Sequence, residues 1–244
     1  MTTFQPAELR FVQFSLNGPD VEKFLQGQVT LDVPKLPLNE QRATAICDLK
    51  GRVMFELWLT RRSAEHCEIV IPASVEEALR AHIRKYGAFS KMTSTESLPL
   101  FPHVIHGMAC LSPEDINDGQ AWAAAMIAAG RTWISAVTQG MFQPQELRLH
   151  QRHGVDYDKG CYLGQEVIAR LWFRASPKQW LHRIAGSGAL PEAGSFVRKH
   201  VQVVNAVQRG EGWEALVVAR PDALEGLKLL ELPPELSGSP ERPR

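Results

Sequence analysis

The residue types most able to do chemistry gather in one short stretch, Lys159 to Arg170. Two glycines, Gly160 and Gly164, bracket Cys161 there, so the backbone turns sharply before a helical run. Unpaired backbone N–H groups at a helix N-terminus favour a thiolate, and Lys159 adds a cation if its side chain points the same way. Cys161 is therefore the best candidate for a reactive thiol, although a cysteine by itself is more often a small buried hydrophobe.

The other three cysteines, Cys47, Cys67 and Cys110, are widely separated. None belongs to a C-x-x-C pair, and none has a histidine at zinc-finger spacing. We therefore expect reduced thiols and no metal site.

Charge and hydropathy limit the class of protein. Lysine plus arginine and aspartate plus glutamate number 27 each, so no net positive charge attracts nucleic-acid phosphates, and extensive direct nucleic-acid binding is not expected. A hydrophobic content of 44% and a charged content of 22% are typical of a soluble globular protein. The sequence has no secretory leader and no stretch of about 18 apolar residues that could cross a bilayer. These observations predict a cytoplasmic protein without a membrane segment.

The elements that must position the chemical residues begin with a mixed unit of strands and helices. Alternating apolar residues predict strands at 9–16, 42–47, 52–60 and 67–71. Apolar residues at helical intervals after Ser74 predict a helix that ends at Gly87. A sheet covered on one face by helices is an α+β arrangement, which is the predicted fold class.

The middle of the chain is less regular. Residues 95–118 carry three prolines around one apolar stretch, which predicts a connector with a single strand. A helix is predicted at 119–129, where Trp122 and Met126 share a face.

The C-terminal third predicts a separate small β-structure. Short alternating segments divided by glycine and proline turns favour a small β-barrel or sandwich. The last residues are rich in proline, serine and charge and are predicted to be disordered. The expected division is a first region over residues 1–175, a C-terminal domain over 176–233 and a disordered tail over 234–244.

The stretch from Lys159 to Arg170 resembles the signature of the YgfZ family, which is related to the aminomethyltransferase (T-protein) of the glycine-cleavage system. The family pattern K-G-C-Y-x-G-Q-E-x-x-A-R is matched at all nine specified letters within twelve positions, which chance rarely produces. Three further family elements follow in the same order: QGQVT at 26–30, CDLKGR at 47–52 and FQPQ at 142–145. The resemblance thus covers most of the chain.

The resemblance implies a T-protein-like fold with a reduced middle domain and a C-terminal small β-barrel. Family members bind tetrahydrofolate or a folate derivative in the central opening of a ring of domains, and they support iron–sulfur cluster assembly or repair. In bacteria this role is associated with the methylthiolation of tRNA by an iron–sulfur enzyme. The implied partners are folate and iron–sulfur enzymes or assembly factors, and the neutral charge balance agrees with an indirect effect on tRNA.

Folate combines a flat pterin with an anionic glutamate tail, so its site needs an aromatic slot, hydrogen-bonding groups and positive charge. Trp122 matches by position a family tryptophan implicated in folate contact. A core aromatic on an amphipathic helix explains its spacing equally well. Phe11 stands where the family has another tryptophan, which retains stacking and loses an indole N–H donor.

Polar folate candidates come from two of the family elements. Gln165 and Glu166 can hydrogen-bond a pterin edge, and Arg170 completes this set, although Glu166 and Arg170 also have the spacing of a surface pair on a helix. The resemblance places Asp48, with Lys50 and Arg52, at the rim of the opening, where ordinary turn chemistry is the simpler interpretation.

One departure from the family is length. Only about 25 residues separate the first unit from the helix that carries Trp122, too few for a separate core. The ring is then either reduced or completed by another chain, so a homo-oligomer is one way to enclose the folate.

Three functions stay open. The first is a folate-dependent accessory factor in iron–sulfur assembly, with Cys161 as its essential thiol. The second is a tetrahydrofolate-dependent aminomethyltransferase, in which a carboxylate steers proton movement. Met54 and Phe55 occupy the positions of the acidic pair of true glycine-cleavage enzymes, and Glu56 replaces that pair only if the alignment shifts by one or two residues. The third is a non-catalytic scaffold that has kept the fold.

Overall fold

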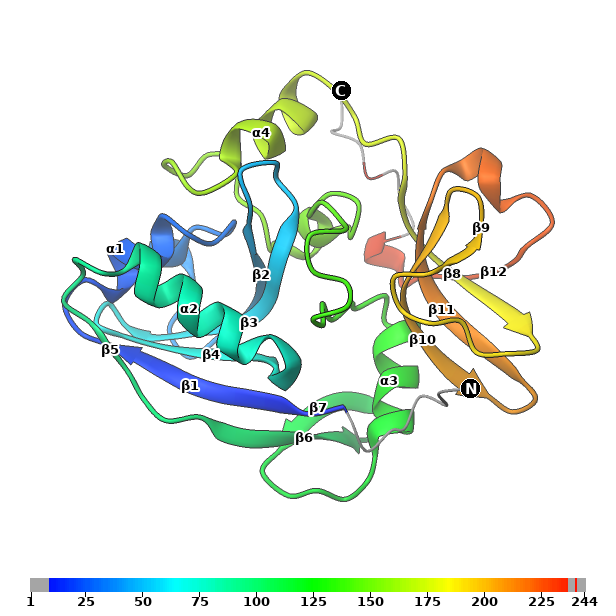
Figure 1. Ribbon diagram of the computed structural model, residues 1–244, viewed down its shortest axis with the longest axis horizontal. Coiled ribbons are helices and arrows are strands. Elements are labelled where there is room, and N and C mark those ends of the chain that lie inside the picture. Colours follow the sequence, from blue (N-terminus) through cyan, green and yellow to red (C-terminus); the bar gives the residue numbers. More distant parts are fainter. Residues whose placement is uncertain (1–8, 237–239, 241–244) are drawn as a thin grey trace.

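A computed structural model describes residues 9–236 and residue 240. It has two antiparallel sheets joined by helices and irregular segments (Figure 1). The larger sheet has seven strands in the order β2-β3-β4-β1-β6-β7, with β5 also paired to β1. The smaller has five in the order β12-β8-β11-β10-β9. Mixed helix and antiparallel sheet is the predicted α+β class.

The bounds of the elements are as follows. The larger sheet comprises β1 (Phe11–Asn17), β2 (Gln41–Cys47), β3 (Val53–Ser63), β4 (His66–Pro72), β5 (Thr93–Ser94), β6 (Leu98–Ile105) and β7 (Met108–Ser112). The smaller comprises β8 (Trp180–Ser187), β9 (Phe196–Arg198), β10 (Val201–Arg209), β11 (Gly212–Ala219) and β12 (Lys228–Leu230). The α-helices are α1 (Val21–Gln26), α2 (Glu76–Tyr86), α3 (Gly119–Ala128) and α4 (Gln165–Phe173).

Alternation along β3 decides which side chains meet the core and which meet the opposite face of the larger sheet. One face is apolar and is covered by α1 and α2, and the buried residues of β3 and α2 that cluster there are Phe55, Leu57, Leu59, Leu79 and Ile83. Glu56 and Trp58 point from the other face, because successive side chains of a strand alternate. A shift of one residue in register would exchange the two sets.

The middle of the chain forms a β-hairpin, so the prediction of a single strand there is wrong. His106 and Gly107, both with positive φ, make the tight turn between β6 and β7. The prolines suggested a break, but β6 pairs with β1 over residues 98–100 and with β7 over residues 101–105. Pro99 and Pro102 therefore each have a neighbouring strand on one side only, where a missing N–H is tolerated.

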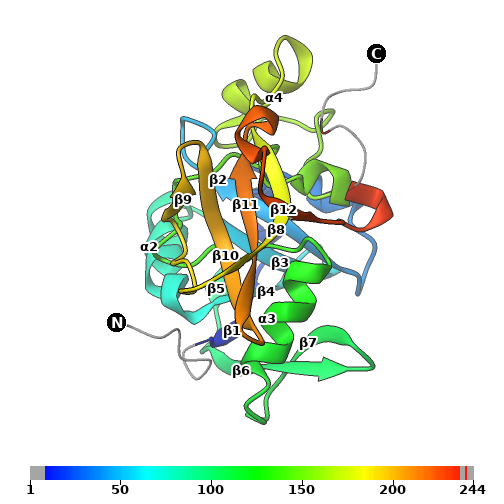
Figure 2. The same cartoon turned by 90° about the vertical axis from the view of Figure 1, so that its right-hand side faces the viewer.

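Helix α3, predicted at 119–129, lies between the two sheets and contacts β6, β7, β10 and β11 (Figures 1 and 2). Trp122 is fully buried in it and packs against Phe11 and Trp133, with ring centroids 5.0 and 5.2 Å away. This aromatic cluster joins the large sheet, the helix and the loop that follows the helix.

The five-stranded sheet is the small C-terminal β-structure, and the boundary expected near residue 175 falls between α4 and β8. Figure 2 views this sheet beside α3. The buried side chain of Asn205 on β10 connects it to the loop after α3. The backbone N–H of Trp133 donates to Asn205 Oδ1 (3.2 Å), and Asn205 Nδ2 donates to the Trp133 carbonyl (3.0 Å).

The C-terminal segment is packed where it is described, so disorder from residue 234 onward is a wrong prediction for residues 234–236. Leu236 ends a short 3-10 helix, Pro234–Leu236, and is only 1% exposed, because its side chain covers Gly130. Its carbonyl accepts a hydrogen bond from Arg148 (2.7 Å). Residues 1–8, 237–239 and 241–244, on which other predictions fell, lie outside the described residues.

No helix within the described part of the chain is long and apolar enough to cross a membrane.

Replacing Asn205 by alanine is expected to lower the free energy of unfolding by about 2–3 kcal/mol, because it leaves the buried N–H and C=O of Trp133 without partners. Urea unfolding followed by circular dichroism measures this change. Gln208→Ala on the same strand is the control, since the side-chain amide of Gln208 donates to the carbonyl of the exposed Gly210 (3.1 Å). Equal stability of the two variants would contradict the proposed connection.

Candidate functional site

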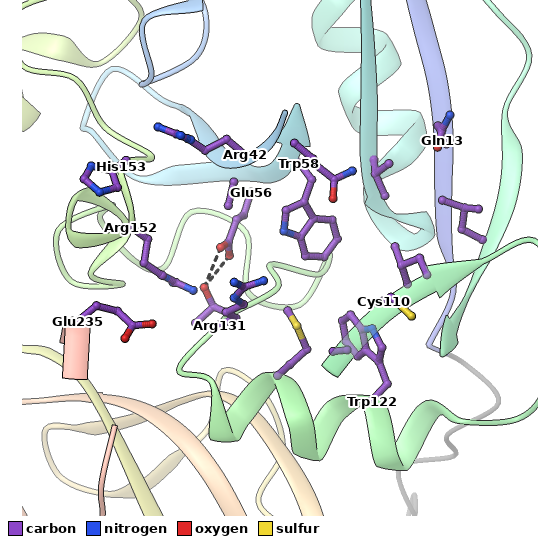
Figure 3. A pocket seen from close by; sticks show the side chains of 18 of the residues that line it. Gln13, Arg42, Glu56, Trp58, Cys110, Trp122, Arg131, Arg152, His153 and Glu235 are labelled. Carbon is purple, nitrogen blue, oxygen red and sulfur yellow. Dashed lines mark hydrogen bonds between the residues drawn. The ribbon is translucent and has the colours of Figure 1, made fainter. Parts of the chain in front are cut away.

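A cavity of about 800 Å³ lies between the larger sheet and α3. Its lining comes from β1 to β4, the β6–β7 hairpin, α3 and the loop after it, the segment 151–153 and the C-terminal tail (Figure 3). Elements from most of the chain therefore build one enclosure.

The floor of the cavity is a row of side chains that runs across four strands. Gln13, Val70, Trp58 and Ala43 lie directly opposite one another in successive strand pairs, from β1 through β4 and β3 to β2. All four line the cavity. The pairing register of the strands thus places Trp58 between Val70 and Ala43, as the aromatic side chain of this row.

Glu56 lies two residues before Trp58 on the same face and is 4% exposed. The Thr132 hydroxyl lies 2.9 and 2.7 Å from its two carboxyl oxygens. A hydroxyl has one proton to donate, so Thr132 shares it between the two carboxyl oxygens of Glu56 in one bifurcated hydrogen bond. Burial raises the pKa of Glu56 to about 7, against the opposing effects of the Arg152 charge and the Thr132 hydrogen bond.

Three arginines line the cavity, at Arg42, Arg131 and Arg152. Figure 3 shows Arg131 and Arg152 converging near Glu56. Arg42 pairs with Glu40, so part of its charge is already balanced. The cavity therefore combines a buried carboxyl group with positive charge in its wall.

The segment that brings Arg152 and His153 to the cavity has a strained residue at each end. The short 3-10 helix Leu149–Arg152 is flanked by Arg148 (φ 55°) and His153 (φ 58°), both in the left-handed region that residues other than glycine rarely adopt. Each such residue costs on the order of 1 kcal/mol, which surrounding contacts must offset. The Arg148 guanidinium supplies them by donating to the carbonyls of Leu181 (3.0 Å) and Leu236 (2.7 Å).

The signature stretch lies elsewhere, against the turn between β2 and β3. A Cβ on Gly164 would come within 2.4 Å of the Asp48 carbonyl, and one on Gly51 within 3.1 Å of Val167. Close approach of the two backbones therefore requires glycine at both positions. The Asp48 carboxylate accepts bonds from the N–H groups of Lys50 (2.9 Å) and Arg52 (2.8 Å), which is turn chemistry.

Lys159 is buried, and its ammonium group is engaged by the backbone. Nζ donates to the carbonyls of Gln26 (2.8 Å), Val29 (2.7 Å) and Leu31 (2.7 Å). These bonds use all three N–H donors, and burial lowers the pKa of Lys159 to about 8. The prediction that Lys159 supplies a free cation to Cys161 is therefore wrong.

Cys161 itself is exposed and lies in the turn before Gly164, the residue that precedes α4. Gln165, Glu166 and Arg170 follow in the first two turns of that helix, and Glu166 and Arg170 are exposed. Neither the thiol nor these three residues belong to the cavity lining that the described residues form. The structure thus separates the signature from the cavity.

Trp122 is the sequence-predicted folate residue that the cavity contains. Its indole Nε1 is buried and has no hydrogen-bond partner among the described residues. Phe11 packs behind it, between Trp122 and Trp58, with centroid distances of 5.0 and 5.4 Å.

Sequence reasoning named Glu56 only as the carboxylate of a shifted alignment, and it assigned no role to the other cavity residues. Glu56 and Trp58 carried a usable signal, because a polar and a large aromatic residue alternate with Phe55, Leu57 and Leu59 in a buried strand. Arg131 and Arg152 carried no such signal, since both lie outside the strands and α-helices, in segments that only the tertiary structure brings to the cavity.

No family model matches the chain. Curated relatives named tRNA-modifying protein YgfZ do: the protein from Shigella boydii serotype 4 (strain Sb227) is 30% identical over 251 residues, 82% of this chain and 74% of the relative. The protein from Serratia proteamaculans (strain 568) is 29% identical over 252 residues, with the same coverage. Among solved structures, glycine cleavage system aminomethyltransferase T from Bartonella henselae has a TM-score of 0.62 at 12% identity, covering 93% of this chain and 84% of that one. That likeness shows a shared fold.

Lys159→Met is expected to lower the free energy of unfolding by about 2–4 kcal/mol, because three backbone carbonyls lose their donor. Lys159→Arg should not restore it, since a planar guanidinium cannot point at three converging carbonyls. Urea unfolding measures both, and the exposed Lys50→Met is the control. A Lys159→Met variant as stable as the control would show that this contact holds nothing together.

Glu56→Gln is expected to change how stability depends on pH. A folded pKa near 7 against an ordinary 4.5 means that the folded state keeps a proton that the unfolded state has lost. The contribution of Glu56 to stability should therefore fall as the pH rises from about 4.5 to about 7, by roughly 3 kcal/mol at 1.36 kcal/mol per pKa unit. Buried His82, His150 and His182, whose pKa values are lowered to about 4, contribute in the opposite direction, so the test is the difference between variant and wild type. That difference should change with pH for Glu56→Gln and stay constant for the exposed Glu77→Gln, when urea unfolding is measured from pH 4 to pH 8.

Proposed function

Because this chain belongs to the YgfZ family, we propose that it binds a folate in the cavity and acts as an accessory factor in iron–sulfur cluster assembly or repair. Through that role it supports the modification of tRNA, the activity for which its curated relatives are named. The observation that carries the folate proposal is the buried carboxyl of Glu56 beside Trp58, in a cavity whose wall also holds arginines.

The lining fits the parts of a folate. The volume of about 800 Å³ is that of an ordinary small-molecule site. Trp58 offers aromatic surface to a flat pterin, and Glu56 can donate or accept at the polar pterin edge. Trp122, which is 1% exposed, supports this wall from behind. Arg131 and Arg152 offer charge-assisted hydrogen bonds to the carboxylates of a glutamate tail. A bound tetrahydrofolate would bring the capacity to carry a one-carbon unit.

The effect on tRNA is proposed to be indirect. The chain carries equal numbers of basic and acidic residues, which gives no general attraction for phosphates. Cys161 is exposed on a turn outside the cavity lining, so a partner protein could reach its thiol without entering the folate site. We propose iron–sulfur enzymes or assembly factors as these partners.

A second candidate is one-carbon transfer by the protein itself, as in an aminomethyltransferase. Glu56 favours it, because its carboxyl lines the cavity from β3, the strand that follows the CDLKGR turn. Burial raises its pKa to about 7, and a proton-transferring group is most useful near neutral pH. Turnover of a folate-bound one-carbon unit that disappears in Glu56→Gln while folate binding persists would select this function over the accessory role.

Titration of tetrahydrofolate by calorimetry tests the site. Saturable binding to the wild type is expected, and Trp58→Leu should weaken it about tenfold, because stacking on an aromatic face is worth on the order of 1 kcal/mol beyond buried area. Trp180→Leu, which removes a tryptophan outside the cavity, and Cys161→Ser should leave the affinity unchanged. Absence of saturable binding to the wild type would overturn the folate proposal and leave the scaffold function.

A further inference from the structure

The C-terminal tail forms part of the cavity wall. After β12 the chain passes through the 3-10 helix Pro234–Leu236, and Glu235 within that helix lines the cavity. Figure 3 shows Glu235 on the same side of the cavity as Arg131 and Arg152. An exposed carboxylate of the chain itself thus stands where positive charge is offered to a ligand.

The position of Glu235 is fixed by its neighbours. Leu236 is buried over Gly130, the residue before Arg131. The carbonyl of Leu236 accepts from Arg148 (2.7 Å), and that of Pro240 accepts from His150 Nε2 (2.9 Å). These contacts tie the tail to both backbone segments that carry the cavity arginines, so the carboxylate and the arginines belong to one framework.

Charges of both signs surround Arg152 without a ligand. The pKa of Arg152 is lowered by burial, raised by Glu56, lowered by the like charge of Arg131 and raised by Glu235. Glu56 contributes little negative charge below neutral pH, since burial raises its pKa to about 7. Among the described residues that line the cavity, Glu235 then supplies negative charge against part of the charge of Arg131 and Arg152.

We propose that Glu235 is a specificity-determining residue of the cavity, a carboxylate that shares the wall with Arg131 and Arg152 and weakens their attraction for the anionic end of a ligand. This inference rests on the proposed function for the identity of the ligand. Its chemistry concerns any carboxylate-bearing ligand: competition with Glu235 weakens such a ligand and leaves an uncharged one unaffected. A ligand with two carboxylates, such as the glutamate tail of folate, competes better than a ligand with one.

The test compares wild type, Glu235→Gln and the matched control Glu231→Gln by calorimetry. Glu231 lies in the same segment and is exposed, and it does not belong to the cavity lining, so its replacement changes the net charge equally. Three probes are used: tetrahydrofolate, p-aminobenzoylglutamate as the tail alone, and 6-methyltetrahydropterin as the uncharged ring alone. All variants alter exposed side chains and should fold.

The expected result is that Glu235→Gln binds tetrahydrofolate and the tail probe about fivefold more tightly than wild type, the effect of removing one exposed charge near a carboxylate. Glu231→Gln should match wild type, and the pterin probe should bind all three proteins equally. About 0.5 M salt should abolish the difference, because exposed charges are screened.

The outcomes separate this inference from the proposed function. Equal binding of the tail probe and of tetrahydrofolate by wild type and Glu235→Gln would overturn the role of Glu235 while the folate site stands. Tighter binding of the tail probe to Glu235→Gln, with no binding of the pterin or of tetrahydrofolate, would support Glu235 and overturn the folate assignment. If none of the three probes binds, both ideas are overturned.

Discussion

The register of β3 is the constraint on which the rest of the structure depends. Five consecutive residues of this strand, 55–59, serve both faces of the sheet. They supply apolar side chains to the core under α2 on one face, and a carboxyl and an indole to the cavity on the other. Phe55, Leu57 and Leu59 do the first, and Glu56 and Trp58 do the second. Because the side-chain period is two, no local adjustment can satisfy one set without the other. The core and the cavity floor are therefore specified by the same hydrogen-bond ladder.

The residues that match the YgfZ family elements have two roles: some hold the fold together, and Cys161 is exposed to partners. Lys159 binds three carbonyls of the segment 26–31, which itself belongs to a shared element, and Gly164 allows the backbone to approach the turn at Asp48. Much of the signature thus fastens distant parts of the chain together. Cys161 is exposed and lies between Lys159 and Gly164 in this stretch. The sequence motif from Lys159 to Arg170 therefore contains residues that stabilise the fold as well as the candidate reactive thiol.

The sequence was sufficient for the fold class, the helices at α2 and α3 and the family, because these rest on periodicity and on contiguous letters. It was insufficient for the cavity, whose residues come from strands, a hairpin, a helix, a strained loop and the tail. The β6–β7 hairpin was missed because its prolines read as breakers, and their tolerance follows from a change of pairing partner along β6. The buried end of the tail was missed because one leucine, Leu236, outweighs the polar composition around it.

That change of partner along β6 has an evolutionary consequence. Residues 98–100 pair with β1, whereas residues 101–105 pair, among the described strands, with β7 alone, so the hairpin extends beyond the edge of β1 and packs on α3. Lengthening or shortening it leaves every pairing among β1, β2, β3 and β4 intact. Since Ala109, Cys110 and Leu111 of β7 form one side of the cavity, such changes would resize the enclosure above an unaltered floor. The hairpin is thus a place where descendants of this fold can gain or lose length and so adapt to ligands of different bulk.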